Sequence, residues 1–194
     1  MALRLVKFDI GFCLFSVAFL LIMPLRFVLA CLLSVTVHEL CHILALYICK
    51  IRILGLCMHM TGMEIMTDPL TRKQEFFCAL AGPLGSCLLA LCGRYLPLTA
   101  ICAFIHAAYN LLPICPLDGG RALHSLLSCL LGDTAGQKVF EVLTRFVSGT
   151  LLLAVAWFAW YYQFNIATIG ILVLVAFKAL KRKSSCKQGK LIVQ

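Results

Sequence analysis

Two histidines and a glutamate lie close together in the segment 38–42, which reads HELCH. Residues four apart on an α-helix lie on one face, one turn apart, so the imidazoles of His38 and His42 can reach the same ion. Glu39 is turned about 100° from that face, and its carboxylate can instead accept a proton from water that the metal activates. The spacing predicts a metal site with two histidine ligands and Glu39 as the general base.

The same pattern also fits two core histidines that hydrogen-bond to the backbone, with Glu39 paired to one of them. The setting favours the metal, because the motif lies near the middle of the apolar run 27–49. An ionisable residue inside a lipid-spanning helix costs about 2.5–3.5 kcal/mol to insert and usually marks a functional site.

A third ligand is needed, because catalytic zinc sites usually have three protein ligands and a water. Asp118 is our prediction for it. This residue follows two prolines in the segment 110–120, NLLPICPLDGG, and irregular backbone at membrane depth is tolerated only where it lines protein or a watery cavity. An aspartate here could equally cap a helix that starts near Arg121. The presence of the first motif favours the metal.

The composition predicts a membrane protein. Of the 194 residues, 62% are hydrophobic and 13% charged, whereas a soluble domain of this size needs a polar surface. The net charge is +9, but Lys and Arg lie at the edges of apolar runs and near the C-terminus, as the positive-inside rule predicts. We expect no nucleic-acid partner. The 12 cysteines form no Cys-x-x-Cys pair and are interpreted as packing residues.

The apolar runs predict an all-α polytopic membrane protein with about six transmembrane helices, at 8–25, 27–49, 76–93, 98–112, 142–162 and 164–178. A Pro/Gly-rich break at 113–120 leads to a short helix at 121–131. We expect a single transmembrane domain over 1–180, with its core at 27–131, and a basic cytosolic tail at 181–194. Both termini are predicted to be cytosolic, because Arg26 and Arg94 alone among the Lys and Arg residues then face outward.

A short β-hairpin is predicted between the second and third helices, from residues 51–54 and 63–66. Such a hairpin could add a strand to an extended peptide. His59, His106 and His124 are interpreted as structural histidines.

Three motifs in order, HELCH at 38–42, AGPLGS at 81–86 and NLLPICPLDGG at 110–120, resemble the site-2 protease family of intramembrane zinc metalloproteases. The third motif is most similar to the branch that includes stage IV sporulation protein FB. The resemblance spans about 34–121 and implies that Asp118 is the third zinc ligand. It also implies that Asn110 faces the site and holds the substrate backbone or an oxyanion. Ser86 stands where many members have Asn.

The resemblance implies hydrolysis of peptide bonds within or next to the bilayer of a bacterial cell membrane. Expected substrates are membrane proteins or membrane-associated proteins, such as pro-sigma factors, anti-sigma factors or other tethered regulators, with an inhibitory membrane partner as a further expectation. The same residues would also fit a zinc or proton transporter, or a relative that binds membrane clients without cleaving them. The sequence leaves the oligomeric state open.

Overall fold

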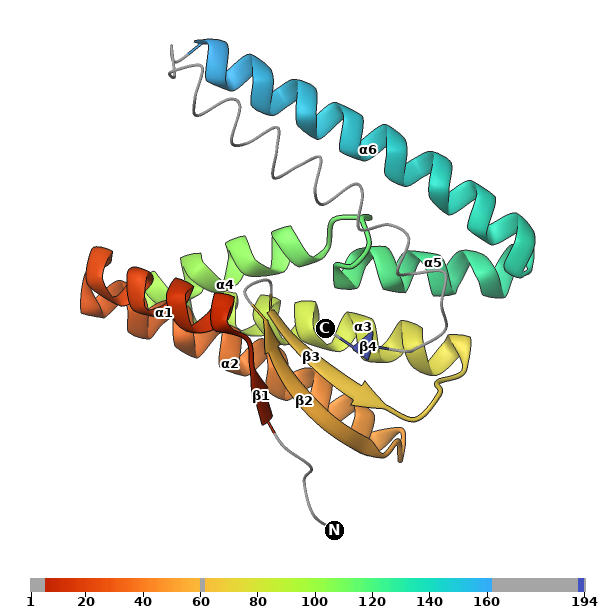
Figure 1. Cartoon of the computed structure of the whole chain (residues 1–194), viewed down its shortest axis with the longest axis horizontal. Helices are drawn as coiled ribbons and strands as arrows, with labels where there is room; N and C mark the ends of the chain where they lie inside the picture. Colours follow the sequence, from red (N-terminus) through yellow and green to blue (C-terminus); the bar gives the residue numbers. More distant parts are fainter. Residues whose placement is uncertain (1–5, 60–61, 162–191, 194) are drawn as a thin grey trace.

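Helices make up most of the structure, a computed structural model that describes residues 6–59, 62–161 and 192–193 (Figure 1). The helices are α1 (Ile10–Ile22), α2 (Leu25–Ile48), α3 (Arg72–Ala90), α4 (Pro97–Asn110), α5 (Asp118–Leu131) and α6 (Asp133–Tyr161), with a 3-10 turn η1 (Leu91–Arg94) after α3. Four strands form one sheet in the order β1 (Val6–Phe8), β2 (Ile53–His59), β3 (Gly62–Thr67) and β4 (Ile192–Val193).

Three helical segments are long and apolar enough to cross a membrane: Leu25–Ile48, Arg72–Arg94 and Asp133–Phe158. Helices also lie at the first and fourth predicted spans, but α1 has 13 residues and α4 has 14, fewer than the roughly 20 that a bilayer requires. The sixth predicted span, 164–178, and most of the basic tail lie outside the described residues. The helical architecture is confirmed, and the count of about six spans is not.

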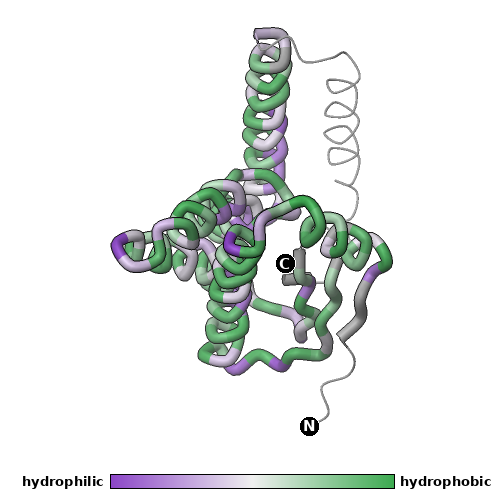
Figure 2. Tube along the Cα trace, turned by 90° about the vertical axis from the view of Figure 1, so that its left-hand side faces the viewer, coloured by the Kyte–Doolittle hydropathy of each residue, from purple (hydrophilic) through white to green (hydrophobic). Residues whose placement is uncertain are grey.

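Many residues of the helices are hydrophobic, as the hydropathy colouring in Figure 2 shows, and many of their large apolar side chains are exposed. Leu21 and Leu91 are each 82% exposed. A water-soluble protein rarely displays continuous apolar surface of this kind. The outward-facing leucines therefore fit a lipid environment.

Helix α3 lies at the centre of the helical part and contacts α2, α4 and α5. Thr71 starts it with a capping box, in which Thr71 and Gln74 satisfy each other's backbone N–H groups. Its small residues let α2 approach closely: a Cβ on Gly85 would lie 2.2 Å from the Sγ atom of Cys41. Close packing through small residues is the usual way in which membrane helices associate.

The inward face of α2 carries the first motif. Ser34, His38 and His42 are buried on this face, while Cys41 and Ala45 are partly buried. The fourfold spacing of the buried residues is that of a helix with one face against protein.

The predicted hairpin is confirmed as the antiparallel pair β2 and β3, with Cys57 opposite Glu64. Its strands are longer than expected, and its inner face packs on α2 and α3 through the buried cluster Leu46, Met63, Ile65 and Cys78. Both outer edges of the hairpin have neighbours. β1 runs parallel to β2, and β4 pairs with β3 at Ile65 and Met66.

The break before α5 is shorter than predicted, because α5 begins at Asp118 and includes both glycines of the motif. These glycines allow close packing: a Cβ on Gly119 would lie 2.2 Å from the carbonyl oxygen of Leu111, and one on Gly120 2.5 Å from the carbonyl carbon of Ile114. α6 begins at Asp133, earlier than the predicted residue 142, directly after Gly132, where φ is +81°. The prediction followed the apolar run and so missed the first turns of the helix, which are polar.

The α2–α3 contact predicts the effect of Gly85→Ala. The added methyl overlaps the side chain of Cys41, and we expect a loss of about 1–3 kcal/mol in stability, measured by thermal unfolding in detergent. Gly149→Ala is the matched control, because a Cβ there meets nothing within 4 Å; it should be neutral or stabilising by up to about 1 kcal/mol. Equal unfolding temperatures for the two variants would contradict the close contact.

Candidate metal centre

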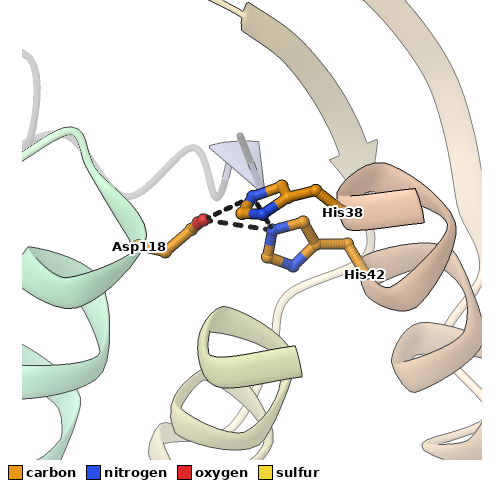
Figure 3. A group of neighbouring side chains, drawn as sticks. All are labelled: His38, His42 and Asp118. Carbon is orange, nitrogen blue, oxygen red and sulfur yellow. Dashed lines mark hydrogen bonds and ion pairs between the residues drawn. The ribbon is translucent and has the colours of Figure 1, made fainter. Parts of the chain in front are cut away.

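His38, His42 and Asp118 converge from two helices, as Figure 3 shows. The Nε2 atoms of the two histidines lie 3.2 Å apart, and the Oδ2 atom of Asp118 lies 3.0 Å from His38 Nε2 and 3.1 Å from His42 Nε2. All three side chains are buried. Among the described residues they form a group with the reach to hold a metal ion. The structure thus brings together the three residues that the sequence predicts as ligands.

The remaining ring nitrogens of both histidines contact α3. His42 Nδ1 lies 2.7 Å from the backbone carbonyl oxygen of Cys78, and His38 Nδ1 lies 2.9 Å from Ser86 Oγ. Because a carbonyl only accepts, Nδ1 of His42 donates to it; in the neutral form of the ring, this leaves the lone pair of Nε2 facing Asp118. Histidine ligands of metals are typically held by such a contact on the other nitrogen.

The donor set fits a divalent metal. Two imidazole nitrogens and a carboxylate oxygen lie about 3 Å apart, and their lone pairs repel one another unless a proton or a metal cation lies among them. Nitrogen and carboxylate ligands in a set of three are typical of catalytic zinc sites, which leave a fourth position for water or substrate. We interpret the group as a candidate site for a divalent metal.

Gly82 of α3 leaves room beside both Nε2 atoms. A Cβ at this position would lie 2.2 Å from His42 Nε2 and 2.7 Å from His38 Nε2. Any side chain here would occupy the space in which both nitrogens meet the carboxylate. Gly82 is therefore part of the site, because its lack of a side chain leaves space for the two imidazole nitrogens.

Asp118 does not cap α5, which was the alternative interpretation. It is the first residue of the helix, Leu117 is the N-cap, and no side-chain capping bond is present. Its Oδ2 atom faces the histidines, while Oδ1 is buried without a hydrogen-bond partner among the described residues. The carboxylate is thus directed at the imidazoles.

Glu39 follows His38 on α2 and does not belong to the ligand group. Its Oε2 atom is buried and has no hydrogen-bond partner among the described residues. Burial of an unpartnered carboxylate oxygen is unfavourable, so such a group is usually retained for function. A carboxylate oxygen without a hydrogen-bond partner can accept a proton, as a general base must.

Helix α4 brings a third histidine, His106, to the site. The ring of His106 stacks on that of His38 with centroids 4.4 Å apart and planes 28° apart. Its Nδ1 atom is buried and unpartnered in the described part of the chain. The interpretation of His106 as structural overlooked this position. The sequence signal was its spacing of four from Asn110, which places both on one face of α4.

The other predicted residues lie as follows. Asn110 is partly buried at the end of α4, and its side-chain amide donates to the carbonyl oxygen of His106 at 3.1 Å. His124 Nε2 contacts Gln137 Oε1 at 2.6 Å, which ties α5 to α6. The side chain of His59 lies outside the description.

Comparisons with known proteins agree with this geometry. The family described as Peptidase family M50 matches residues 92–154, a segment that includes Asp118. Among solved structures, the Site-2 Protease from Methanocaldococcus jannaschii has a similar fold, with a TM-score of 0.61 and 22% sequence identity. The similarity covers 91% of this chain and 89% of that one. A search of curated proteins gave no match. Residues 92–154 are therefore similar to Peptidase family M50, and the chain shares its fold with the Methanocaldococcus jannaschii structure.

Gly82→Ala should remove the metal. Its methyl would overlap both Nε2 atoms, so we expect elemental analysis of the purified variant to find metal far below the stoichiometric amount in the unchanged protein. Gly149→Ala should retain the full amount. A Gly82→Ala protein with stoichiometric metal would show that these nitrogens are not the ligands.

Ser86→Ala should weaken metal binding by about 10–100-fold, because it removes the hydroxyl that orients His38. A chelator competition assay measures the change. Ser125→Ala is the matched control, since Ser125 is also fully buried but its hydroxyl has no hydrogen-bond partner among the described residues. Equal affinities in the two variants would mean that the Ser86 contact does not position the ligand.

Proposed function

We propose that this chain is an intramembrane zinc metalloprotease of the site-2 type. The observation that carries the proposal is the meeting of His38, His42 and Asp118, residues from segments about 80 positions apart. In addition, the Oε2 atom of Glu39 has no hydrogen-bond partner among the described residues. α2, which holds the histidines, is of membrane-spanning length. The Peptidase family M50 match and the site-2 protease fold support the same activity.

The chemistry divides between the metal and the protein. A zinc ion bound by these ligands would supply Lewis acidity, which polarises a carbonyl group and lowers the pKa of water toward neutrality. Glu39 takes a proton from the attacking water as the water oxygen adds to the scissile carbonyl carbon. It then gives a proton to the departing amine nitrogen as the C–N bond breaks.

Asn110 is proposed to hold the substrate backbone or the developing oxyanion. Its support is its place at the end of α4, directly before the segment 111–117 that leads to Asp118. The amide already donates to the carbonyl of His106, so it must share or release that hydrogen bond when it contacts substrate.

Substrates are proposed to be membrane-tethered regulators, with pro-sigma and anti-sigma factors as the leading classes and a sporulation pro-sigma factor as the first to test. This part rests on the resemblance of the third motif to the sporulation branch. A location in a bacterial cell membrane with both termini in the cytosol is proposed from the Lys and Arg distribution. An inhibitory membrane partner belongs to the same proposal.

The β-hairpin is a proposed contact for the substrate, because an extended peptide can add to a sheet edge. In this chain β4 pairs with β3 at Ile65 and Met66. A substrate strand on that edge would therefore compete with residues 192–193.

Glu39→Gln separates a protease from a transporter. In a co-expression assay with single-span regulators, we expect cleavage to fall by about 10²–10⁴-fold, while the purified variant keeps its zinc. The isosteric change removes the proton acceptor and leaves the three ligands in place.

Glu141→Gln on α6 serves as the matched control and should cleave normally. A transporter would instead carry zinc across reconstituted vesicles and produce no shortened substrate. Full cleavage by Glu39→Gln would refute the proposed mechanism.

A further inference from the structure

Two buried charged residues lie near Oδ1 of Asp118, the carboxylate oxygen that does not contact the histidines. Arg121 from α5 is 6% exposed, and Glu75 from α3 is 8% exposed. Arg121 Nη1 lies 4.0 Å from Asp118 Oδ1, and Arg121 Nη2 lies 3.9 Å from Glu75 Oε1. The guanidinium thus stands between the metal-facing aspartate and a carboxylate of the neighbouring helix.

These charges act on each other strongly because they are buried. Water and salt screen an exposed ion pair, but a pair inside the protein keeps most of its Coulomb interaction. Asp118 Oδ1 and both Nη atoms of Arg121 have no hydrogen-bond partner among the described residues. Asp118 Oδ2 contacts the two histidines, whereas among the described residues the guanidinium of Arg121 is the polar group that attracts Oδ1.

Asp118 needs such an orientation. It lies in the first turn of α5, where unpaired backbone N–H groups attract a carboxylate. A side chain turned toward those groups would no longer present Oδ2 to the histidines. Arg121 follows at i+3 on the same face of the helix and attracts Oδ1 instead.

We propose that Arg121 is a positioning residue for the metal site. Its guanidinium draws Oδ1 of Asp118 toward α3, so that Oδ2 faces His38 and His42. Glu75 holds the guanidinium from the other side, and Arg72 holds Glu75 with Nη1 3.5 Å from Oε2. The inference rests on the proposed function to the extent that these residues bind a metal ion.

The competing explanation is that Arg121 and Glu75 only tie α5 to α3. The two explanations differ in the metal affinity that they predict for a variant lacking both charges. Glu75→Gln/Arg121→Gln removes both charges of the pair between α3 and α5 together, while Arg72 keeps its contact with Asp133 and Asp118 keeps its contacts with the histidines. If the pair is only a tie, the double variant regains both stability and metal affinity.

The experiment measures zinc affinity by chelator competition and the unfolding temperature of the metal-free protein, both in detergent. Arg121→Gln should weaken zinc binding by about 10–100-fold and lower the unfolding temperature. The double variant should recover the unfolding temperature but not the affinity. Arg121→Lys should retain part of the affinity, because lysine keeps the charge and lacks the planar fork.

Cobalt substitution gives a second readout, since the visible spectrum of bound Co²⁺ reports the ligand arrangement. We expect an altered spectrum for Arg121→Gln and for the double variant. The matched control is Arg145→Gln on α6, which breaks a surface ion pair with Glu141 at 3.3 Å. It should change neither the affinity nor the spectrum.

Wild-type zinc affinity in the double variant would overturn the proposal, and this outcome decides the matter even if Arg121→Gln fails to fold. Asp118→Ala distinguishes this failure from that of the proposed function. If Asp118→Ala loses zinc while the double variant keeps it, only the role of Arg121 is wrong. If Asp118→Ala binds zinc as the unchanged protein does, the metal site itself is wrong.

Discussion

The mutual approach of two imidazole nitrogens and one carboxylate oxygen governs the architecture around them. Three lone-pair donors about 3 Å apart inside a protein repel one another, and burial removes the water that would otherwise separate them. A proton or a metal cation shared among them makes the arrangement favourable. The protein must therefore hold the donors in place while it keeps other groups out of the space between them.

One face of helix α3 provides most of the contacts that hold the histidine rings in place. Cys78, Gly82 and Ser86 are spaced by four, so they line up along the side that meets α2. Cys78 offers a backbone carbonyl to His42, Gly82 leaves space beside the nitrogens, and Ser86 contacts His38. A helix that supplies no ligand thus determines how both histidine rings are oriented.

The third ligand depends on a different kind of contact. Glycines at 119 and 120 let the start of α5 lie directly against the backbone of 111–115, which brings Asp118 to the level of the histidines. The buried charges of Arg121 and Glu75 continue this contact along α3 and α5. The exposed pair of Arg72 with Asp133, 3.2 Å apart, joins the end of this row to the first turn of α6.

The placement of His38 and His42 on one face could be predicted from the sequence because it depends on local spacing. The HELCH motif places two imidazoles on one helix face. Apolar runs of membrane-spanning length indicate a lipid environment. Both inferences follow from helix geometry. Asp118 could be proposed from its motif, and the hairpin from its turn-flanked strands. The number of spans could not be settled in this way, because apolar runs such as that of α4 form helices shorter than a bilayer.

Tertiary structure decided what surrounds the ligands. Nothing local indicates that Arg121, a charged residue after two glycines, is buried against Glu75, or that His106 stacks on His38. These contacts join residues 46 and 68 positions apart, and they exist only once α3, α4 and α5 have packed around α2. Spacing along one helix is set by its own hydrogen bonds, whereas contacts between helices are set by which faces fit together.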